Sequence, residues 1–385
     1  MKKICFLLVL FLCPFSVFAI DLASNAKSAI IIEPTTGKII FEKNSNERLE
    51  PASMTKIMTL LLTFEAIDNG RVSLDDMVNI SKRAEDMGGS QMFLEAGSNI
   101  RLEEIIKGVS IASANDGAIA LAEFIGGSVE NFVDMMNKKV EDLGLSNTHF
   151  ANPHGLHADN HYSSAYDMAI MASNLISHEK VLNYTSIYED YFNKPDGSRT
   201  WLVNTNKLVR FLEGVDGLKT GYTSEAGYCL TATAKKGNVR YITVVMGEPS
   251  SDIRSSETAN MLNYAFNSFK LNTILDKSQE LGTIYIDKSK QKTAKIVVKN
   301  PVTELISKEK DIPNYTYNLK VEKINLPLML TVIASVSIET VQLVIGRVFD
   351  VDDIILNLLG GIFGYVIYKI LKGIGEKLPK FCHSE

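Results

Sequence analysis

Ser53 and Lys56 stand at the start of an apolar run that continues to Phe64. On a helix, residues three apart lie on one face, so the lysine amine can reach the serine hydroxyl. Pro51 is typical of a helix start. Apolar residues on all sides predict burial, and burial lowers the pKa of a lysine because the ammonium loses its water. We therefore expect a neutral Lys56 that acts as the base for a nucleophilic Ser53.

The spacing of this pair is weak evidence by itself, because it recurs in the chain. The other occurrences are Ser24/Lys27, Ser177/Lys180, Ser289/Lys292 and Ser307/Lys310. These four lie in polar surroundings or close to the two ends of the chain, where nothing would strip water from the lysine. The context of Ser53, and not the spacing, makes it the candidate.

Two further motifs follow Ser53 in order. Ser113-Ala-Asn115 is the only S-x-N in the chain, and Lys219-Thr-Gly221 is the only K-T-G. A hydroxyl and an amide in a helix-breaking loop, and a cationic edge strand with a glycine for close approach, complete a site for acyl transfer. Taken singly, each has a plainer explanation. The first could cap a helix that begins at Asp116, and the second could be an exposed edge strand.

Composition limits the class of protein. The chain has 385 residues, 45% of them hydrophobic, and a net charge of -5. This length predicts more than one domain, and the charge gives no sign of nucleic-acid binding. The start, Met1-Lys2-Lys3 followed by an apolar run to Phe18, predicts a signal peptide over residues 1–19 that is cut after Ala19. We expect an exported protein.

Helical and strand patterns that combine as helices on one antiparallel sheet predict an α+β catalytic domain over residues 20–275. A hairpin of Ala29–Glu33 and Lys38–Glu42 comes first, and a second small hairpin is expected near the Gly88-Gly89 and Gly97 turns. Helices are expected at Leu102–Ser110, Asp116–Phe124, Val129–Leu143, Ser164–Ile176 and Ser255–Phe269. Strands are expected at Val215–Tyr222, Tyr228–Ala234 and Tyr241–Met246. Cys229, inside one of these strands, is interpreted as a buried small apolar residue.

The last third of the chain changes character. Residues 276–325 predict a small β module, and residues 326–385 contain two apolar stretches, 328–345 and 354–375. Each is about as long as the ~20 residues that span a membrane. Lysines follow the second stretch, whereas Glu339 and Gln342 weaken the first. Because lysines prefer the cytoplasm, we expect one crossing, by residues 354–370.

The three motifs together resemble those of the serine D-alanyl-D-alanine carboxypeptidases, the low-molecular-mass penicillin-binding proteins, over roughly residues 29–322. The resemblance implies a penicillin-binding, β-lactamase-like transpeptidase domain that removes the terminal D-alanine from the peptidoglycan pentapeptide. It implies inhibition by β-lactam antibiotics, no cofactor and no metal. It also implies a catalytic domain on the outer face of the bacterial cytoplasmic membrane, with membrane lipid as a partner of the tail.

The same resemblance assigns a role to each motif residue. It makes Ser53 the nucleophile, Lys56 the base and Ser113 a proton relay to the departing D-alanine. The oxyanion hole would be the backbone N–H groups of Ser53 and Tyr222. It assigns substrate contacts to Asn115, Lys219, Thr220, Gly221, Tyr222 and Arg254.

The resemblance to the carboxypeptidase family does not extend to the end of the chain. In the family, the β module continues and leads to an amphipathic anchor helix, whereas here it stops at Pro327. The last sixty or so residues instead resemble the end of the VanZ-like membrane proteins, with motifs at 337–342, 346–353 and 357–361. A natural fusion and a gene rearrangement would both produce this sequence. The β module is therefore expected to be incomplete.

Three other interpretations remain open at this point. A β-lactamase shares the motifs but needs a well-placed glutamate for rapid deacylation, and Phe150–Leu156 has none. A non-catalytic membrane-anchored protein that binds wall peptides would keep the fold and lose the chemistry. A zinc site could use the histidines of the same region, although their spacing does not match the zinc peptidase signature. Those residues are His149, His154, His157 and His161, with Asp159 among them.

Overall fold

A computed structural model describes residues 21–285, 293–310, 312, 313 and 315 of the chain. The expected signal peptide and both expected membrane segments lie outside these residues. The chain divides into two units, Met1–Lys270 with Ser307–Glu309, and Leu271–Ile306 with Lys310–Glu385.

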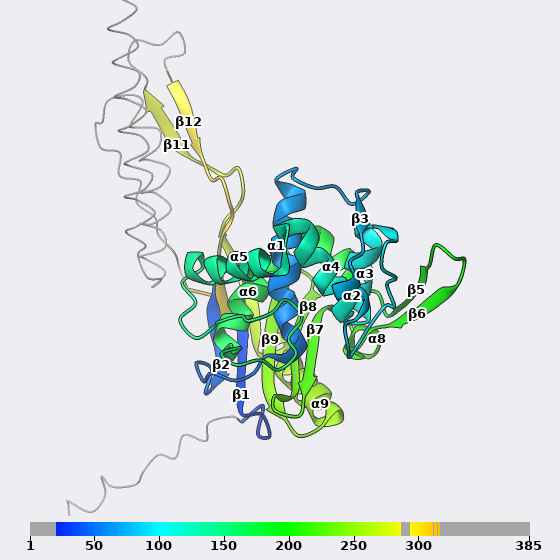
Figure 1. The fold of residues 1–385 in the computed structure, drawn as a ribbon. Coiled ribbons are helices and arrows are strands. Elements are labelled where there is room, and N and C mark those ends of the chain that lie inside the picture. The colour runs from blue at the N-terminus through cyan, green and yellow to red at the C-terminus, as the bar shows by residue number, and fades with distance from the viewer. Residues whose placement is uncertain (1–20, 286–292, 311, 314, 316–385) are drawn as a thin grey trace, which may run out of the picture. The chain divides into compact units, whose positions relative to one another are not determined.

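The first unit is built on an antiparallel sheet with the strand order β2-β1-β9-β8-β7 (Figure 1). The expected first hairpin is present, and its strand β1 is buried along its whole length because it lies between β2 and β9. Strand β7 lies at one end of this order and carries the Lys219-Thr-Gly221 motif. The strands are β1 (Ser28–Glu33), β2 (Lys38–Lys43), β7 (Val215–Thr223), β8 (Gly227–Lys236) and β9 (Val239–Glu248).

Helices cover both faces of this sheet. Alternate side chains of β9 belong to different layers: Ile242 and Val244 join the core formed with the long helices, whereas Tyr241 contacts the ring of Phe266 on α9. Burial of both faces explains why the strands read as nearly continuous apolar runs. The longer helices are α1 (Lys56–Asp68), α3 (Leu102–Ile111), α4 (Asn115–Gly126), α5 (Val129–Asp142), α6 (Ala165–Ser177) and α9 (Ser251–Ser268).

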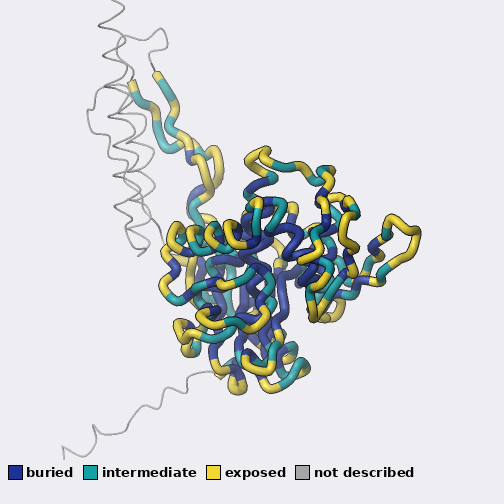
Figure 2. Tube along the Cα trace, in the orientation of Figure 1, coloured by how far each residue is buried: buried dark blue, intermediate teal, exposed yellow. Residues whose placement is uncertain are grey.

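Helix α1 runs through the middle of the helical layer and is buried over most of its length (Figure 2). It packs against α4 and α6, and the 3-10 turn η1 (Ala52–Thr55) before it packs against β7. The helical core therefore fixes the turn beside the edge strand. Shorter helical segments are α2 (Lys82–Glu85), η2 (Glu179–Val181), α7 (Leu182–Thr185) and α8 (Leu208–Phe211).

Two small hairpins complete the first unit. Strand β3 (Met77–Asn79) pairs with β4 (Asn99–Arg101), and the expected Gly88, Gly89 and Gly97 turns lie between them. Strand β5 (Glu189–Asn193) pairs with β6 (Arg199–Val203), a hairpin that the sequence analysis did not predict.

The second unit contains short strands, as the sequence predicts. Strand β10 (Phe269–Leu275) neighbours β13 (Val302–Ser307), and β11 (Glu280–Tyr285) pairs with β12 (Thr293–Val297). No helix among the described residues has the length and apolar character needed to span a bilayer.

Candidate active site

Ser53 lies in the 3-10 turn η1, one residue after Ala52, whose backbone has the left-handed φ of +47°. The sequence predicts one helix from Pro51, but the structure has a 3-10 turn that becomes an α-helix at Lys56. The Lys56 amine still donates a hydrogen bond to the Ser53 hydroxyl, at 3.0 Å. The expected pairing of the two side chains is therefore present across the junction of the two helical segments.

Lys56 is fully buried and its amine has three acceptors. Besides Ser53 Oγ, these are Asn115 Oδ1 at 2.7 Å and the backbone carbonyl of His154 at 2.6 Å. Burial lowers the pKa of Lys56 well below its ordinary value, the positive charge of Lys219 lowers it further, and Asp116 partly opposes both. A lysine with such a pKa is available as a neutral base for the neighbouring hydroxyl.

Asn115 is held between two elements and does not cap helix α4. Its amide nitrogen donates to the Gly88 carbonyl at 2.7 Å while its oxygen accepts from Lys56. The N-cap residue is Ala114, which makes no side-chain capping bond, so the plainer explanation of the S-x-N motif is wrong. Ser113 is buried beside it with a left-handed φ of +64°, and among the described residues its hydroxyl has no hydrogen-bond partner.

Lys219 is buried on β7, so an exposed edge strand does not explain it. Burial and the positive charge of Arg254 lower the pKa of Lys219 to about 7. Its amine donates to the Thr220 carbonyl at 3.0 Å. The Thr220 hydroxyl in turn donates to the hydroxyl of Thr205 at 2.7 Å, which fixes its orientation.

Gly221 brings the backbone of β7 against the nucleophile turn. A Cβ atom at this position would lie 2.7 Å from the Pro51 carbonyl oxygen and 3.3 Å from the Ser53 nitrogen, so only glycine allows this approach. Tyr222 follows with its side chain exposed, and its ring stacks on that of Tyr228 with the centroids 4.3 Å apart. The Tyr222 phenol is therefore turned toward solvent and Tyr228, and Gly221 is the residue of this strand whose backbone lies against the Ser53 turn.

Arg254 lies in the first turn of α9 and is buried, and its Nε has no hydrogen-bond partner among the described residues. Burial lowers its pKa, and Cys229, Tyr228, Asp252 and Glu248 act in the opposite direction. The carboxyl group of Glu248 does not neutralise it, because burial and the neighbouring Glu257 raise the Glu248 pKa to about 8. Arg254 and Lys219 are thus two buried basic groups that lower each other's tendency to carry a charge, and an anionic ligand beside both would favour their protonated forms.

Two side chains at the site were missed by the sequence analysis. The Asp116 carboxylate accepts hydrogen bonds from the backbone N–H groups of Met92 and Leu94, at 3.0 to 3.1 Å, and so fixes the 88–94 segment that carries the acceptor of Asn115. Asp116 could have been recognised from the sequence as an acidic residue in the first turn of α4. Thr205, which accepts from Thr220, lies in a segment with no motif.

The four histidines do not converge on a common point. His154 Nδ1 accepts from the Leu156 N–H, His149 Nδ1 contacts the Asn160 carbonyl, and His161 contacts Thr55. Burial and the charge of Lys56 lower the pKa of His154 to about 3.

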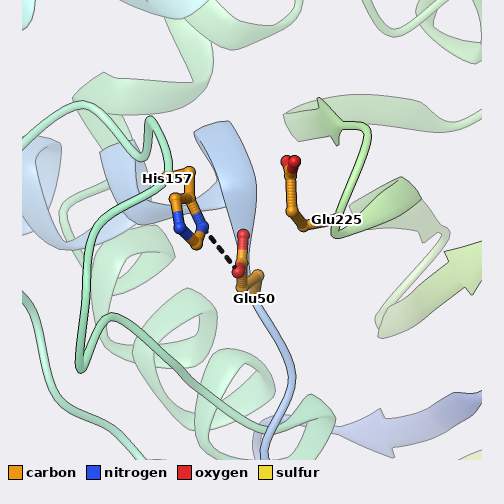
Figure 3. Close-up of side chains that lie close together, drawn as sticks. All are labelled: Glu50, His157 and Glu225. Carbon is orange, nitrogen blue, oxygen red and sulfur yellow. Dashed lines mark hydrogen bonds and ion pairs between the residues drawn. The ribbon is translucent and has the colours of Figure 1, made fainter.

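Among the described residues, one cluster has ligand atoms close enough to hold a metal ion, all within 4.8 Å: those of Glu50, His157 and Glu225 (Figure 3). The hydrogen bond that the His157 ring donates to the Glu50 carboxylate raises the pKa of His157. His157 Nδ1 lies 2.8 Å from Glu50 Oε1, and this ion pair accounts for the contact without a metal.

Comparison with known proteins places this geometry in context. A family model described as D-alanyl-D-alanine carboxypeptidase matches residues 17–250, and one described as VanZ/LLP1 matches residues 283–372. The chain is 48% identical to the D-alanyl-D-alanine carboxypeptidase DacF of Bacillus subtilis, over 80% of this chain and 79% of that protein. It is 38% identical to DacA of Escherichia coli, over 67% of this chain and 65% of that protein.

Solved structures agree with the sequence relatives. Penicillin-binding protein 5 of Haemophilus influenzae superposes with a TM-score of 0.67 at 34% identity, over 74% of this chain and 83% of that one. Penicillin-binding protein D2 of Listeria monocytogenes, solved in an ampicillin-bound form, gives a TM-score of 0.56 at 30% identity, over 63% and 98%. The expected α+β penicillin-binding fold is confirmed.

Proposed function

The chain belongs to the D-alanyl-D-alanine carboxypeptidase family of serine hydrolases, and from this premise we propose that Ser53 forms its acyl-enzyme. The observation that carries the assignment is the fully buried Lys56 amine 3.0 Å from the Ser53 hydroxyl. The pKa of Lys56 is lowered by burial, so the amine can take the hydroxyl proton. The substrate is a peptidoglycan stem peptide that ends in D-Ala-D-Ala.

The reaction has two halves. Ser53 Oγ attacks the carbonyl carbon of the penultimate D-alanine while its proton passes to Lys56. The N–H groups of Ser53 and Tyr222 stabilise the negative charge on the carbonyl oxygen. The Ser113 hydroxyl gives its proton to the amide nitrogen and takes the proton held by Lys56, the C–N bond breaks and D-alanine leaves. Water then hydrolyses the ester and restores the Ser53 hydroxyl.

Recognition of the substrate uses residues of strand β7 and helix α9. The buried cations Lys219 and Arg254, with the Thr220 hydroxyl, bind the terminal carboxylate that any peptide ending in free D-alanine carries. Gly221 lets the strand come close, and the side chain of Asn115 orients the substrate amide beside Lys56. No metal or cofactor takes part.

The test of this function is the lifetime of a penicillin adduct. We expect labelled penicillin to remain on Ser53 through denaturation and to be located there by mass analysis of the peptide. The reason is that Phe150–Leu156, whose His154 carbonyl accepts from the Lys56 amine, contains no Asp or Glu that could activate a deacylating water. Rapid penicillin turnover without an adduct would instead identify a β-lactamase.

We also propose that the protein is exported and anchored in the bacterial cytoplasmic membrane by one crossing at residues 354–370. The support is the lysine bias: Lys369, Lys372, Lys377 and Lys380 lie at the end of this stretch and beyond it, whereas Arg347 is the one cation before it in the 346–353 segment. Cys382 should then resist a membrane-impermeant thiol reagent on intact cells and react after lysis. Strong labelling of intact cells would place the tail outside and exclude a single crossing.

A further inference from the structure

His161 forms a buried hydrogen-bonded connection to the nucleophile turn. Its Nε2 lies 2.8 Å from the Thr55 hydroxyl, and that hydroxyl donates to the Ala52 carbonyl at 2.8 Å. On its other side, Nδ1 accepts the backbone N–H of Ala151 at 3.0 Å. Because a backbone N–H can only donate, Nδ1 carries no proton and Nε2 must carry it. The ring therefore donates to Thr55, and all three bonds run in one direction.

The neutral ring that this connection needs is provided by its surroundings. His161 is 4% exposed and its ring packs against that of Phe150. Burial, with the charges of His149 and His157, lowers the His161 pKa to about 4. Protonation would place a second donor against the Ala151 N–H, so the neutral form is the one that fits.

The connection ends at Ala52, whose backbone conformation is strained. Ala52 adopts a left-handed backbone, φ +47°, which is unfavourable for a residue with a side chain. The Ala52 carbonyl also receives the close approach of Gly155, where a Cβ would lie 1.9 Å from its oxygen. This strained carbonyl belongs to the peptide unit whose nitrogen is that of Ser53, one of the two proposed oxyanion donors.

The segment held by His161 also serves Lys56. Ala151 begins the stretch in which the Pro153 carbonyl accepts from Thr59 at 2.6 Å and the His154 carbonyl accepts from Lys56 at 2.6 Å. One ring therefore ties the turn that carries Ser53 to the loop that carries an acceptor of the Lys56 amine.

We propose that His161 is a positioning residue for acylation. Through Thr55 it sets the orientation of the Ala52–Ser53 peptide, and through Ala151 it sets the loop that holds the Lys56 amine. It touches no substrate. The inference rests on the proposed function, because it concerns the rate at which Ser53 is acylated.

Three variants of the full chain separate the effects of the two hydrogen bonds that the His161 ring makes, to Thr55 and to Ala151. In His161→Gln the longer amide can donate to Thr55 from near the Nε2 position, whereas in His161→Asn the amide can accept from Ala151 but cannot reach Thr55. We expect His161→Asn to lower the first-order acylation constant for labelled penicillin by about tenfold to a hundredfold, because small misplacements of reacting groups cost that much. Binding before acylation should be unchanged, and His161→Gln should recover most of the rate. His149→Asn, on the same segment but bonded only to an exposed carbonyl, is the matched control.

Thr55 provides a second route that does not depend on whether the histidine variants fold. Thr55→Ser keeps the hydroxyl and should acylate like wild type, whereas Thr55→Val should be slow. Adding Thr55→Val to His161→Asn should cost little more, because both remove the same connection. Full acylation rates in His161→Asn or in Thr55→Val, or a loss confined to binding, would overturn the inference. Failure of the wild-type chain to acylate would instead overturn the proposed function.

Discussion

A Ser53→Ala variant should release no D-alanine from a peptide ending in D-Ala-D-Ala, with a loss of at least about 10⁴-fold in rate. The variant lacks the hydroxyl that lies 3.0 Å from the Lys56 amine, so no acyl-enzyme forms. The fold should be unaffected, because Ser53 is partly exposed and alanine suits a helical turn. The measurement is D-alanine release by the intact chain, with thermal unfolding to confirm folding.

Ser177→Ala is the matched control for this experiment. Ser177 has the same spacing to Lys180 as Ser53 has to Lys56, but its hydroxyl is exposed and bonds to the Asn174 carbonyl. It should retain wild-type activity. Residual D-alanine release by Ser53→Ala near the wild-type rate would exclude the serine mechanism, and its loss in the presence of a chelator would point to a metal.

Lys56→Met should abolish the penicillin adduct while leaving the thermal stability unchanged or higher. Methionine is close to lysine in volume and removes a buried amine, so the chain loses its base and also the cost of burying that group. Loss of the three hydrogen bonds to Ser53, Asn115 and the His154 carbonyl opposes part of this gain. Normal labelling of the variant would show that another group is the base.

The same variant has a signature in the pH dependence of stability. The folded pKa of Lys56 lies below its unfolded value, so above the folded pKa the unfolded chain binds a proton that the folded chain lacks. Unfolding free energy then rises with pH, by up to about 1.4 kcal/mol per unit, until the unfolded lysine also titrates. Lys56→Met lacks this rise, so its stability advantage over wild type should shrink between pH 7 and 10 in urea unfolding. Lys180→Met, at an exposed residue, should show no such change.

Local signals in the sequence were enough to predict most of the helices and strands. The capping serine expected at the start of α6 is present, since Ser164 accepts from the Asp167 N–H. Helix α9 begins four residues before the predicted Ser255, because Ser250 caps it in the same way and was not recognised. The β5–β6 hairpin was missed although Pro195-Asp-Gly197 is a turn sequence and Phe192 and Leu202 are its buried positions.

The contacts that complete the site could not be predicted from the sequence. Motif order correctly grouped Ser53, Lys56 and Asn115, but the third acceptor of Lys56 is a backbone carbonyl, which every residue possesses. Asp116 and His161 act through hydrogen bonds to residues far away in the chain. Such pairings depend on how the helices and the sheet pack, and no local pattern encodes them.

The place of β1 in the sheet has a consequence for how the protein acquires its structure. Ala29, near the start of the described chain, pairs with Val245, near the end of the sheet, so almost the entire catalytic unit separates the two partners. Pairings this distant close late and slow folding, because the chain entropy of the intervening loop is lost before the contact forms. Until β9 has been synthesised, the apolar strand Ser28–Glu33 has only β2 beside it, and such an edge invites association with other chains. A chain truncated before Val239 would therefore contain Ser53, Lys56, Asn115 and Lys219 and still accumulate as aggregate.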